Sequence, residues 1–205
     1  LSQCVDEAKA DITIATNLME TRLLCGNGKL LQSMLRKTGP DRIWASSKFY
    51  SGKVEEQRAR HQKHDDTEYN LEPNIKEAPG GLRDIQLINW TAKRHFQVHR
   101  RSHLVEKGFL SEEEYRTLRR DEEFLWKVRY GLHLIAGRAE ERLLFDYQRK
   151  LSEMFGYTDS DGRLGVEKFM QRYYQVVISI RELTDVLLQH LDEAIYREGK
   201  TKWVV

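Results

Sequence analysis

Apolar residues recur every three or four positions through the second half of the chain, a pattern that predicts amphipathic helices. The predicted helices cover residues 82–98, 111–137 and 147–155, and a last helix has its apolar positions between residues 166 and 195. The second of these helices opens with Ser111 and Glu114, which have the spacing of a capping box. Because stripes of this length are usually buried against one another, we expect residues 79–205 to form a helical bundle domain.

The first part of the chain has a mixed pattern. Helices are expected over residues 2–9, 29–37 and 41–64, the last with Asp41 as its N-cap. Residues 11–16 alternate polar and apolar side chains, several of them β-branched, which predicts a half-buried strand. Another strand is expected over residues 19–24, before a Gly-Asn-Gly turn. We therefore expect residues 1–78 to form a small α+β unit.

A turn rich in proline and glycine separates these two parts of the chain. Pro73 and Pro79 lie between residues 69 and 84, and Gly80 and Gly81 follow directly before the helix predicted from residue 82. Such a turn permits exposed N–H groups at a helix N-terminus, which would suit an anion. The alternative interpretation is a domain junction whose glycines only turn the chain.

Composition restricts the class of protein but names no partner. The chain is 40% hydrophobic and 32% charged, with a net charge of +2, which is too small to indicate a nucleic-acid partner by itself. No apolar stretch reaches the length of a membrane span, and Cys4 and Cys25 indicate no disulfide framework. We expect a cytoplasmic protein. A start at Leu1 instead of methionine indicates a piece of a longer protein.

Two groups of side chains have some features of a metal site. His61 and His64 lie three residues apart on a predicted helix, next to Asp65 and Asp66. The HD phosphohydrolase pattern needs another histidine well upstream, so we favour a solvated helix end over a metal site. Residues 158–162 resemble part of a calcium loop, but the flanking ligand positions carry no carboxylates. We expect a polar connector there.

The densest basic cluster closes the helix predicted over residues 82–98. Its members are Lys93, Arg94, His95, His99, Arg100 and Arg101. Cations at a helix C-terminus are stabilised by the helix dipole, which explains much of the cluster. A patch that faces phosphate or an acidic partner is the alternative.

The sequence around the central turn resembles the signature of a known family. Residues 71–77 (LEPNIKE), 79–86 (PGGLRDIQ) and 90–96 (WTAKRHF) are similar to the bacterial bifunctional PII uridylyltransferases and uridylyl-removing enzymes. Ala78 stands where the family pattern leads us to expect glycine. The resemblance runs through the whole chain and is most specific between residues 71 and 96.

The resemblance implies a fold and an activity for the longer protein. In this family a nucleotidyltransferase domain of the polymerase-beta type precedes a helical domain, and a metal-dependent HD domain follows. The chain would then hold the C-terminal part of the nucleotidyltransferase domain (residues 1–78) and the helical bundle domain (residues 79–205). The implied reaction moves UMP from UTP to a tyrosine of the PII signalling protein with Mg²⁺, and the HD domain removes it.

The resemblance also implies roles for individual residues. Glu72, on a strand expected over residues 69–72, takes the place of the third carboxylate of the transferase site. Lys76 and Arg83 flank the turn and would bind phosphate oxygens of the substrate. The Gly-Ser turn and the Asp-x-Asp pair that hold the triphosphate and two metal ions in this superfamily do not occur before Glu72. The isolated chain is therefore expected to be inactive and to hold no Mg²⁺.

Two other functions remain open from the sequence. One is a non-catalytic helical module that docks a partner protein. The other is part of a glutamine synthetase adenylyltransferase, whose corresponding turn we expect to be richer in arginine.

Overall fold

The computed structural model describes residues 1–97 and 100–201, with side chains up to residue 196. The helices are α1 (Ser2–Ala10), α2 (Ile12–Met19), α3 (Gly28–Lys37), α4 (Ser46–Gln62), α5 (Leu82–Phe96), α6 (Ser102–Glu106), α7 (Glu112–Ala136), α8 (Phe145–Met154) and α9 (Gly165–Thr201). Among the described residues, the only extended pairings are isolated bridges of Asn74 with Arg142 and of Ser160 with Arg163. The predicted mainly α fold is confirmed, but the predicted strands are wrong.

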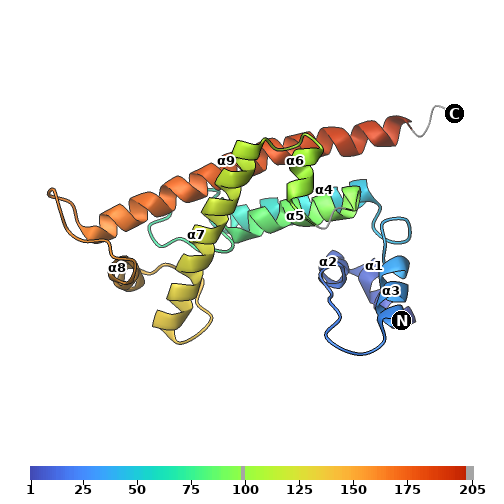
Figure 1. Ribbon diagram of the computed structural model, residues 1–205, viewed down its shortest axis with the longest axis horizontal. Coiled ribbons are helices and arrows are strands. Elements are labelled where there is room, and N and C mark those ends of the chain that lie inside the picture. The colour runs from blue at the N-terminus through green and yellow to red at the C-terminus, as the bar shows by residue number, and fades with distance from the viewer. Residues whose placement is uncertain (98–99, 202–205) are drawn as a thin grey trace.

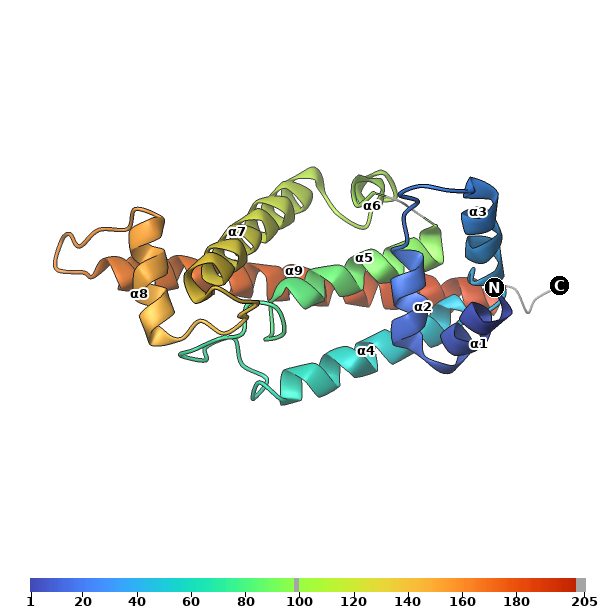
Figure 2. The same ribbon diagram turned by 90° about the horizontal axis from the view of Figure 1, so that it is seen from below.

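Helix α9 runs the length of the molecule, and α4, α5, α7 and α8 pack against it (Figure 1). In Figure 2, which is seen from below, α5 lies in front of α9 with α4 alongside, and α1, α2 and α3 are gathered at the C-terminal end of α9. Helix α8 lies at the opposite end, where α9 begins. The helical bundle predicted from the apolar stripes is thus built around a single long helix.

The apolar stripe of α9 is the centre of the main core. Its residues Phe169, Tyr173, Val177, Ile180, Leu187, Leu191 and Ile195 are all buried. They meet Ile85 and Ile88 of α5 and Leu118, Leu125, Val128 and Leu132 of α7 in one continuous cluster. Each fully buried side chain of this size contributes about 1.5–3 kcal/mol, which stabilises helices that would be marginal alone.

Helix α4 belongs to the same core, although it precedes the central turn. Tyr50 is buried in the main cluster, and its hydroxyl donates to the carbonyl of Leu188 on α9 at 2.9 Å. Burial raises the pKa of this phenol to about 12, so it stays a hydrogen-bond donor at neutral pH. The core therefore crosses residue 78, and the division of the chain at that residue stays a prediction.

Residues 11–16, expected as a strand, form the start of α2. The carboxylate of Asp11 accepts the N–H of Thr13 at 2.6 Å and caps the helix. The hydroxyl of Thr16 donates to the carbonyl of Ile12 at 2.7 Å, so a β-branched residue is accommodated inside the helix. Ala15 then packs with Ala8 and Ile43 in a second, small core. The polar-apolar alternation over residues 11–16 was too short to distinguish the two-residue period of a strand from the 3.6-residue period of a helix.

The strand expected over residues 19–24 is also absent from the structure, because α2 ends at Met19 and the following residues form a bend. Leu24 is 81% exposed, so no sheet covers it. Residues 29–37 form α3, as predicted, with Asn27 as the N-cap. None of the helices in the described part of the chain combines the length and apolar character that crossing a bilayer requires.

Helix α4 begins at Ser46 and not at the predicted Asp41. The intervening residues form a turn in which Trp44 has a φ of +45° and donates its indole N–H to the carbonyl of Ala8 at 2.7 Å. Arg94 of α5 holds this turn, because its guanidinium donates to the carbonyls of Thr38, Ile43 and Trp44. A tertiary contact thus prevents the helix from starting at Asp41.

Candidate functional site

The Pro-Gly-Gly turn is buried, and its N–H groups are all used within the protein. Pro79, Gly80 and Gly81 are buried, and the N–H of Gly80 donates to the Asp84 carboxylate at 2.8 Å. The N–H of Gly81 donates to Ala78 at 2.9 Å, and that of Leu82 to Ile75 at 3.1 Å. The amides of this turn are therefore not free to bind an anion, which favours the alternative in which the glycines only turn the chain.

The two glycines are required by close packing. Gly80 has a φ of +73°, and a Cβ added there would lie 2.0 Å from the carbonyl oxygen of Val177 on α9. A Cβ on Gly81 would lie 2.8 Å from the carbonyl oxygens of Ala78 and Ile75. The turn is pressed between α9 and its own preceding segment, so it fixes where α5 begins.

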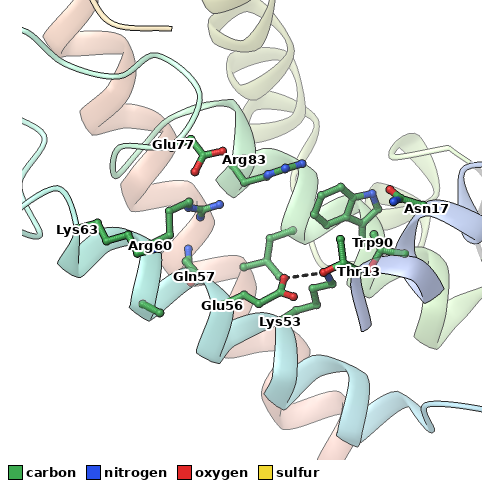
Figure 3. Close-up of a pocket in the computed structure, with 13 residues that line it drawn as sticks. Thr13, Asn17, Lys53, Glu56, Gln57, Arg60, Lys63, Glu77, Arg83 and Trp90 are labelled. Carbon is green, nitrogen blue, oxygen red and sulfur yellow. Dashed lines mark hydrogen bonds and ion pairs between the residues drawn. The ribbon is translucent and has the colours of Figure 1, made fainter. Parts of the chain in front are cut away.

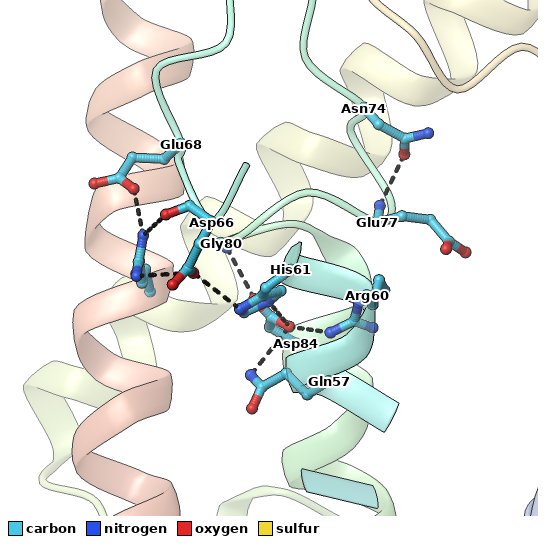
Figure 4. A network of polar contacts seen from close by, with 10 residues as sticks. Gln57, Arg60, His61, Asp66, Glu68, Asn74, Glu77, Gly80 and Asp84 are labelled. Atoms are coloured by element: carbon cyan, nitrogen blue, oxygen red, sulfur yellow. Dashed lines mark hydrogen bonds and ion pairs between the residues drawn. The ribbon is translucent and has the colours of Figure 1, made fainter. Parts of the chain in front are cut away.

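Asp84, in the first turn of α5, is a buried carboxylate that joins α4 to this turn (Figure 4). It is 1% exposed and accepts from Gln57 at 3.2 Å, from the guanidinium of Arg60, and from Nε2 of His61 at 3.0 Å. The fourth donor is the N–H of Gly80. The cation of Arg60 compensates a charge that would be costly to bury alone.

His61 is a structural hydrogen-bond donor in this network, so the predicted solvated helix end is wrong for it. Its side chain is only 13% exposed and lies with Gln57 on the face of α4 that meets α5. Burial lowers the pKa of the nearby His64, which favours its neutral form. Among the described residues, no group of three or more His, Cys, Asp or Glu side chains is placed to hold a metal ion.

A cleft of about 350 Å³ lies beside this network, between α2, α4 and α5 (Figure 3). Its charged residues are Lys53, Glu56, Arg60, Lys63, Glu77 and Arg83, and its other lining residues are Thr13, Thr16, Asn17, Gln57, Ala59, Leu87 and Trp90. Cations outnumber carboxylates, and the side chains of Lys53 and Arg83 lie 5.1 Å and 5.3 Å from the Trp90 ring. The cleft is thus a positively charged hollow with an aromatic wall.

The structure separates the three residues predicted for the site. Arg83 lines the cleft, where it also donates to Gln86 at 2.9 Å, but Glu72 and Lys76 do not line it. The Lys76 ammonium lies 3.7 Å from the Glu77 carboxylate on the turn. Lys76 and Arg83 therefore do not face a common ligand pocket.

Glu72 lies in a bend, not on the predicted strand, and its carboxylate serves helix α8. It accepts the N–H of Phe145, the first residue of α8, at 3.0 Å and lies 3.7 Å from the Arg142 guanidinium. The segment after Glu72 pairs with residues 141–143, because the N–H of Ile75 donates to the carbonyl of Glu141 and the N–H of Leu143 donates to the carbonyl of Pro73. Glu72 thus has a capping role, and its side chain is 25% exposed.

Apart from Arg83, the residues that build the cleft and the network were not predicted as site residues from the sequence. Lys53, Gln57 and His61 are spaced four residues apart on α4, whose end was expected to be solvated. Lys53 is 3% exposed and Gln57 is 7% exposed. A polar stripe at helical spacing, together with Asp84 in the first turn of the next long helix, was the available signal.

The predicted basic cluster is largely structural. Arg94 donates to carbonyls of the turn before α4. Lys93 donates to the carbonyl of Met19 at 2.5 Å and to the carboxylate of Glu20 at 3.0 Å. Arg101 donates to Asn89 at 2.9 Å and to Glu122 at 2.7 Å. The predicted end of the helix at residue 98, and His99, lie outside the described residues.

Comparison with known proteins assigns the family. A sequence profile described as GlnD PII-uridylyltransferase matches residues 48–188, which include the turn, the Asp84 network and most of the main core. The chain is 53% identical over 205 residues to the bifunctional uridylyltransferase/uridylyl-removing enzyme of Stutzerimonas stutzeri. The aligned region covers 100% of this chain and 23% of that protein. No solved structure matches the chain.

Two further relatives carry the same name. The protein of Ectopseudomonas mendocina is 52% identical over 201 residues, which are 98% of this chain and 22% of the relative. That of Pseudomonas aeruginosa strain LESB58 is 54% identical over 195 residues, which are 95% of this chain and 22% of the relative. The chain thus spans less than a quarter of the length of these curated relatives, and it belongs to the GlnD PII-uridylyltransferase family.

Proposed function

We propose that the chain is part of a uridylyltransferase that moves UMP from UTP to a tyrosine of the PII signalling protein in the cytoplasm. The observation that carries this proposal is the 53% identity over all 205 residues to a bifunctional uridylyltransferase/uridylyl-removing enzyme. Conservation of this extent over a whole segment supports the same role for that segment. The chain would supply the end of the nucleotidyltransferase domain and the helical bundle domain that follows it, with no direct role for nucleic acid or membrane.

The reaction transfers a uridylyl group from the pyrophosphate oxygen of UTP to the phenol oxygen of the tyrosine. The phenol oxygen of the tyrosine attacks the α-phosphorus of UTP, the bond from that phosphorus to the bridging oxygen breaks, and pyrophosphate leaves while the phenol proton passes to a base. Such transfers are catalysed mainly by positioning and by positive charge around the phosphates. The cationic cleft beside α5, with Arg83 in its wall, supports this role for the chain.

Magnesium is proposed for the complete protein and is not assigned to these residues. Two-metal transfer needs several carboxylates around one point. Glu72 faces a backbone N–H and a guanidinium, not other carboxylates, and the described residues contain no cluster suited to a metal ion. The residues present therefore do not fit a magnesium site by themselves, and we derive no step through the metal.

Glu72 is proposed as a residue with two tasks, a catalytic carboxylate and a cap of α8. Its side chain is 25% exposed, so a substrate group could approach it from outside the bundle. We expect Glu72→Gln in the complete protein to lower transfer by about 10²–10⁴, the usual contribution of a positioned base. Folding should change little, because the glutamine oxygen still accepts the Phe145 N–H.

The test measures the mass gain of the PII protein after incubation with UTP and the complete protein, with circular dichroism as a folding control. Glu140→Gln is the matched control, because Glu140 accepts the N–H groups of Glu141 and Arg142 in the loop that ends at α8. No transfer by the unmodified protein would overturn the proposed function. Near-normal transfer by Glu72→Gln would remove only the catalytic task of Glu72.

A further inference from the structure

The cleft between α2, α4 and α5 holds cations that the protein itself leaves without counter-charge. Lys63 and Arg83 line it, and neither forms an ion pair with a carboxylate of the described residues. Arg83 is held against the Trp90 ring at 5.3 Å, so its guanidinium is positioned although it is not neutralised. Cations fixed in a hollow without an acidic partner are the usual preparation for an anionic ligand.

Arg60 adds a buried and incompletely satisfied donor to the same cleft. Its side chain is 12% exposed, one terminal nitrogen donates to Asp84, and its Nε is buried without an acceptor among the described residues. Burial lowers the pKa of this guanidinium, and the positive charge of Arg83 lowers it further, against the opposite effect of Asp84 and Glu77. An anion in the cleft would compensate this cost.

Lys53 forms the buried part of the wall. It is 3% exposed, its ammonium donates to Glu56 at 2.8 Å, and it lies 5.1 Å from the centre of the Trp90 ring. The other two ammonium hydrogens have no acceptor among the described residues. From α2, Asn17 adds an amide group to the lining of the cleft.

We infer that this cleft binds a diphosphate group, with Lys53, Arg60, Lys63 and Arg83 as its ligands on the protein. The excess of positive charge suits a group of at least two negative charges, and about 350 Å³ is near the small end of ligand sites. Guanidinium groups match phosphate oxygens in planar, paired hydrogen bonds. The carboxylates of Glu56 and Glu77, which also line the cleft, disfavour a broad acidic protein surface as the ligand.

The choice of a diphosphate rests on the proposed function, because that reaction both uses a nucleoside triphosphate and releases pyrophosphate. The group can therefore reach the cleft from either source. The Arg60–Asp84 contact would also link the occupied cleft to the Pro-Gly-Gly turn, since Asp84 holds the N–H of Gly80.

The test is calorimetric titration of the 205-residue chain with pyrophosphate, UTP, UMP and a short polyglutamate peptide at fixed ionic strength. We expect pyrophosphate and UTP to bind and compete with each other, and UMP to bind at least tenfold more weakly. Lys63→Ala and Arg83→Ala should each weaken pyrophosphate binding by about 10-fold to 100-fold, the effect of one charge-assisted hydrogen bond. Arg83→Lys should recover part of the loss.

Lys150→Ala is the control, because it removes one positive charge from an exposed position on α8, at the far end of the molecule (Figure 1). Equal weakening in this variant, or unchanged binding in both cleft variants, would overturn the inference, and so would polyglutamate that binds as tightly as pyrophosphate. Binding of UTP without competition by pyrophosphate would also overturn it. These outcomes do not depend on turnover, so they are separate from a failure of the transferase function.

Discussion

Gly80 occupies a position where both conformation and space require glycine. Its φ is +73°, and an added Cβ would approach the Val177 carbonyl oxygen to 2.0 Å. We expect Gly80→Ala to lower the free energy of unfolding by more than about 3 kcal/mol, because strain in the left-handed region adds to a clash with the backbone of α9. Urea unfolding followed by circular dichroism measures this loss.

The matched control is Gly156→Ala. Gly156 has a similar φ of +76°, but nothing lies within 4 Å of an added Cβ. Only the conformational cost applies there, which is about 1–2 kcal/mol. Equal losses in the two variants would mean that α9 moves away from the turn without cost.

Asp84 allows a second test at the scale of a single residue. It is the counter-ion of the largely buried Arg60, so Asp84→Asn would leave a guanidinium without a compensating charge. We expect a loss of about 3 kcal/mol in the free energy of unfolding, the lower end for breaking a buried ion pair. Denaturant unfolding measures it, with Asp146→Asn at an exposed site of α8 as the control. A loss below about 1 kcal/mol would contradict the role.

The importance of Asp84 was not predictable from its own neighbourhood. In the sequence it is one charged residue in the first turn of an amphipathic helix, where a carboxylate is ordinary. Its donors Gln57, Arg60 and His61 lie on another helix, and only the packing of α4 on α5 brings them together. Asp84 was identified in the sequence as part of the family signature at residues 79–86, but its contacts became visible only in the tertiary structure.

At the scale of elements, the capping box at the start of α7 gives a prediction with a pH dependence. The Ser111 hydroxyl accepts the N–H of Glu114 at 3.2 Å, and the Glu114 carboxylate accepts the N–H of Ser111 at 2.7 Å. This backbone hydrogen bond, with the Ser111 hydroxyl, lowers the pKa of Glu114 from its ordinary value of 4.5. The stabilisation is therefore complete above pH 4.5 and is lost as pH falls through the lower pKa of the folded protein.

We expect Ser111→Ala to destabilise the protein by about 1 kcal/mol at pH 7, the usual effect of losing a cap. The difference from the unmodified protein in unfolding midpoint should begin to shrink below pH 4.5 and should be smallest below the lowered pKa of Glu114 in the folded protein, where the carboxylate is neutral. Thermal unfolding at several pH values measures both effects. A difference that is constant between pH 7 and pH 3 would show that the Glu114 charge contributes nothing.

Elements with long periodic stripes were predictable, and short ones were not. The capping box and stripe of α7 gave this helix within about two residues of its observed ends, and the stripe of α9 gave the start of that helix, because many apolar positions agree on one period. The stripe ends at residue 195, whereas α9 continues to Thr201. Residues 11–16 are too few to distinguish a strand from a helix, and the cap at Asp11 was not weighed. The turn before α4 depends on Arg94, which lies about fifty residues further along the chain.

At the scale of the molecule, the described residues form two hydrophobic cores of unequal size. The main core surrounds α9, and the small core joins α1, α2 and the turn at Ile43. Polar contacts from α5 connect the two: Arg94 reaches the carbonyls around residue 43, and Lys93 reaches the end of α2. The cleft lies where these parts meet, so its shape depends on this connection.

Arg94 therefore controls how firmly α1, α2 and α3 are attached to the bundle. It is 3% exposed, and burial lowers its pKa to about 10, so it remains charged at neutral pH. Arg94→Met would leave the carbonyls of Thr38, Ile43 and Trp44 without their donor. We expect amides of residues 1–45 to exchange at least about tenfold faster in hydrogen–deuterium exchange, while α5, α7 and α9 keep their protection. Arg149→Met, at an exposed site on α8, is the control. Equal acceleration throughout the bundle would contradict a local role, because the loss would then report global unfolding.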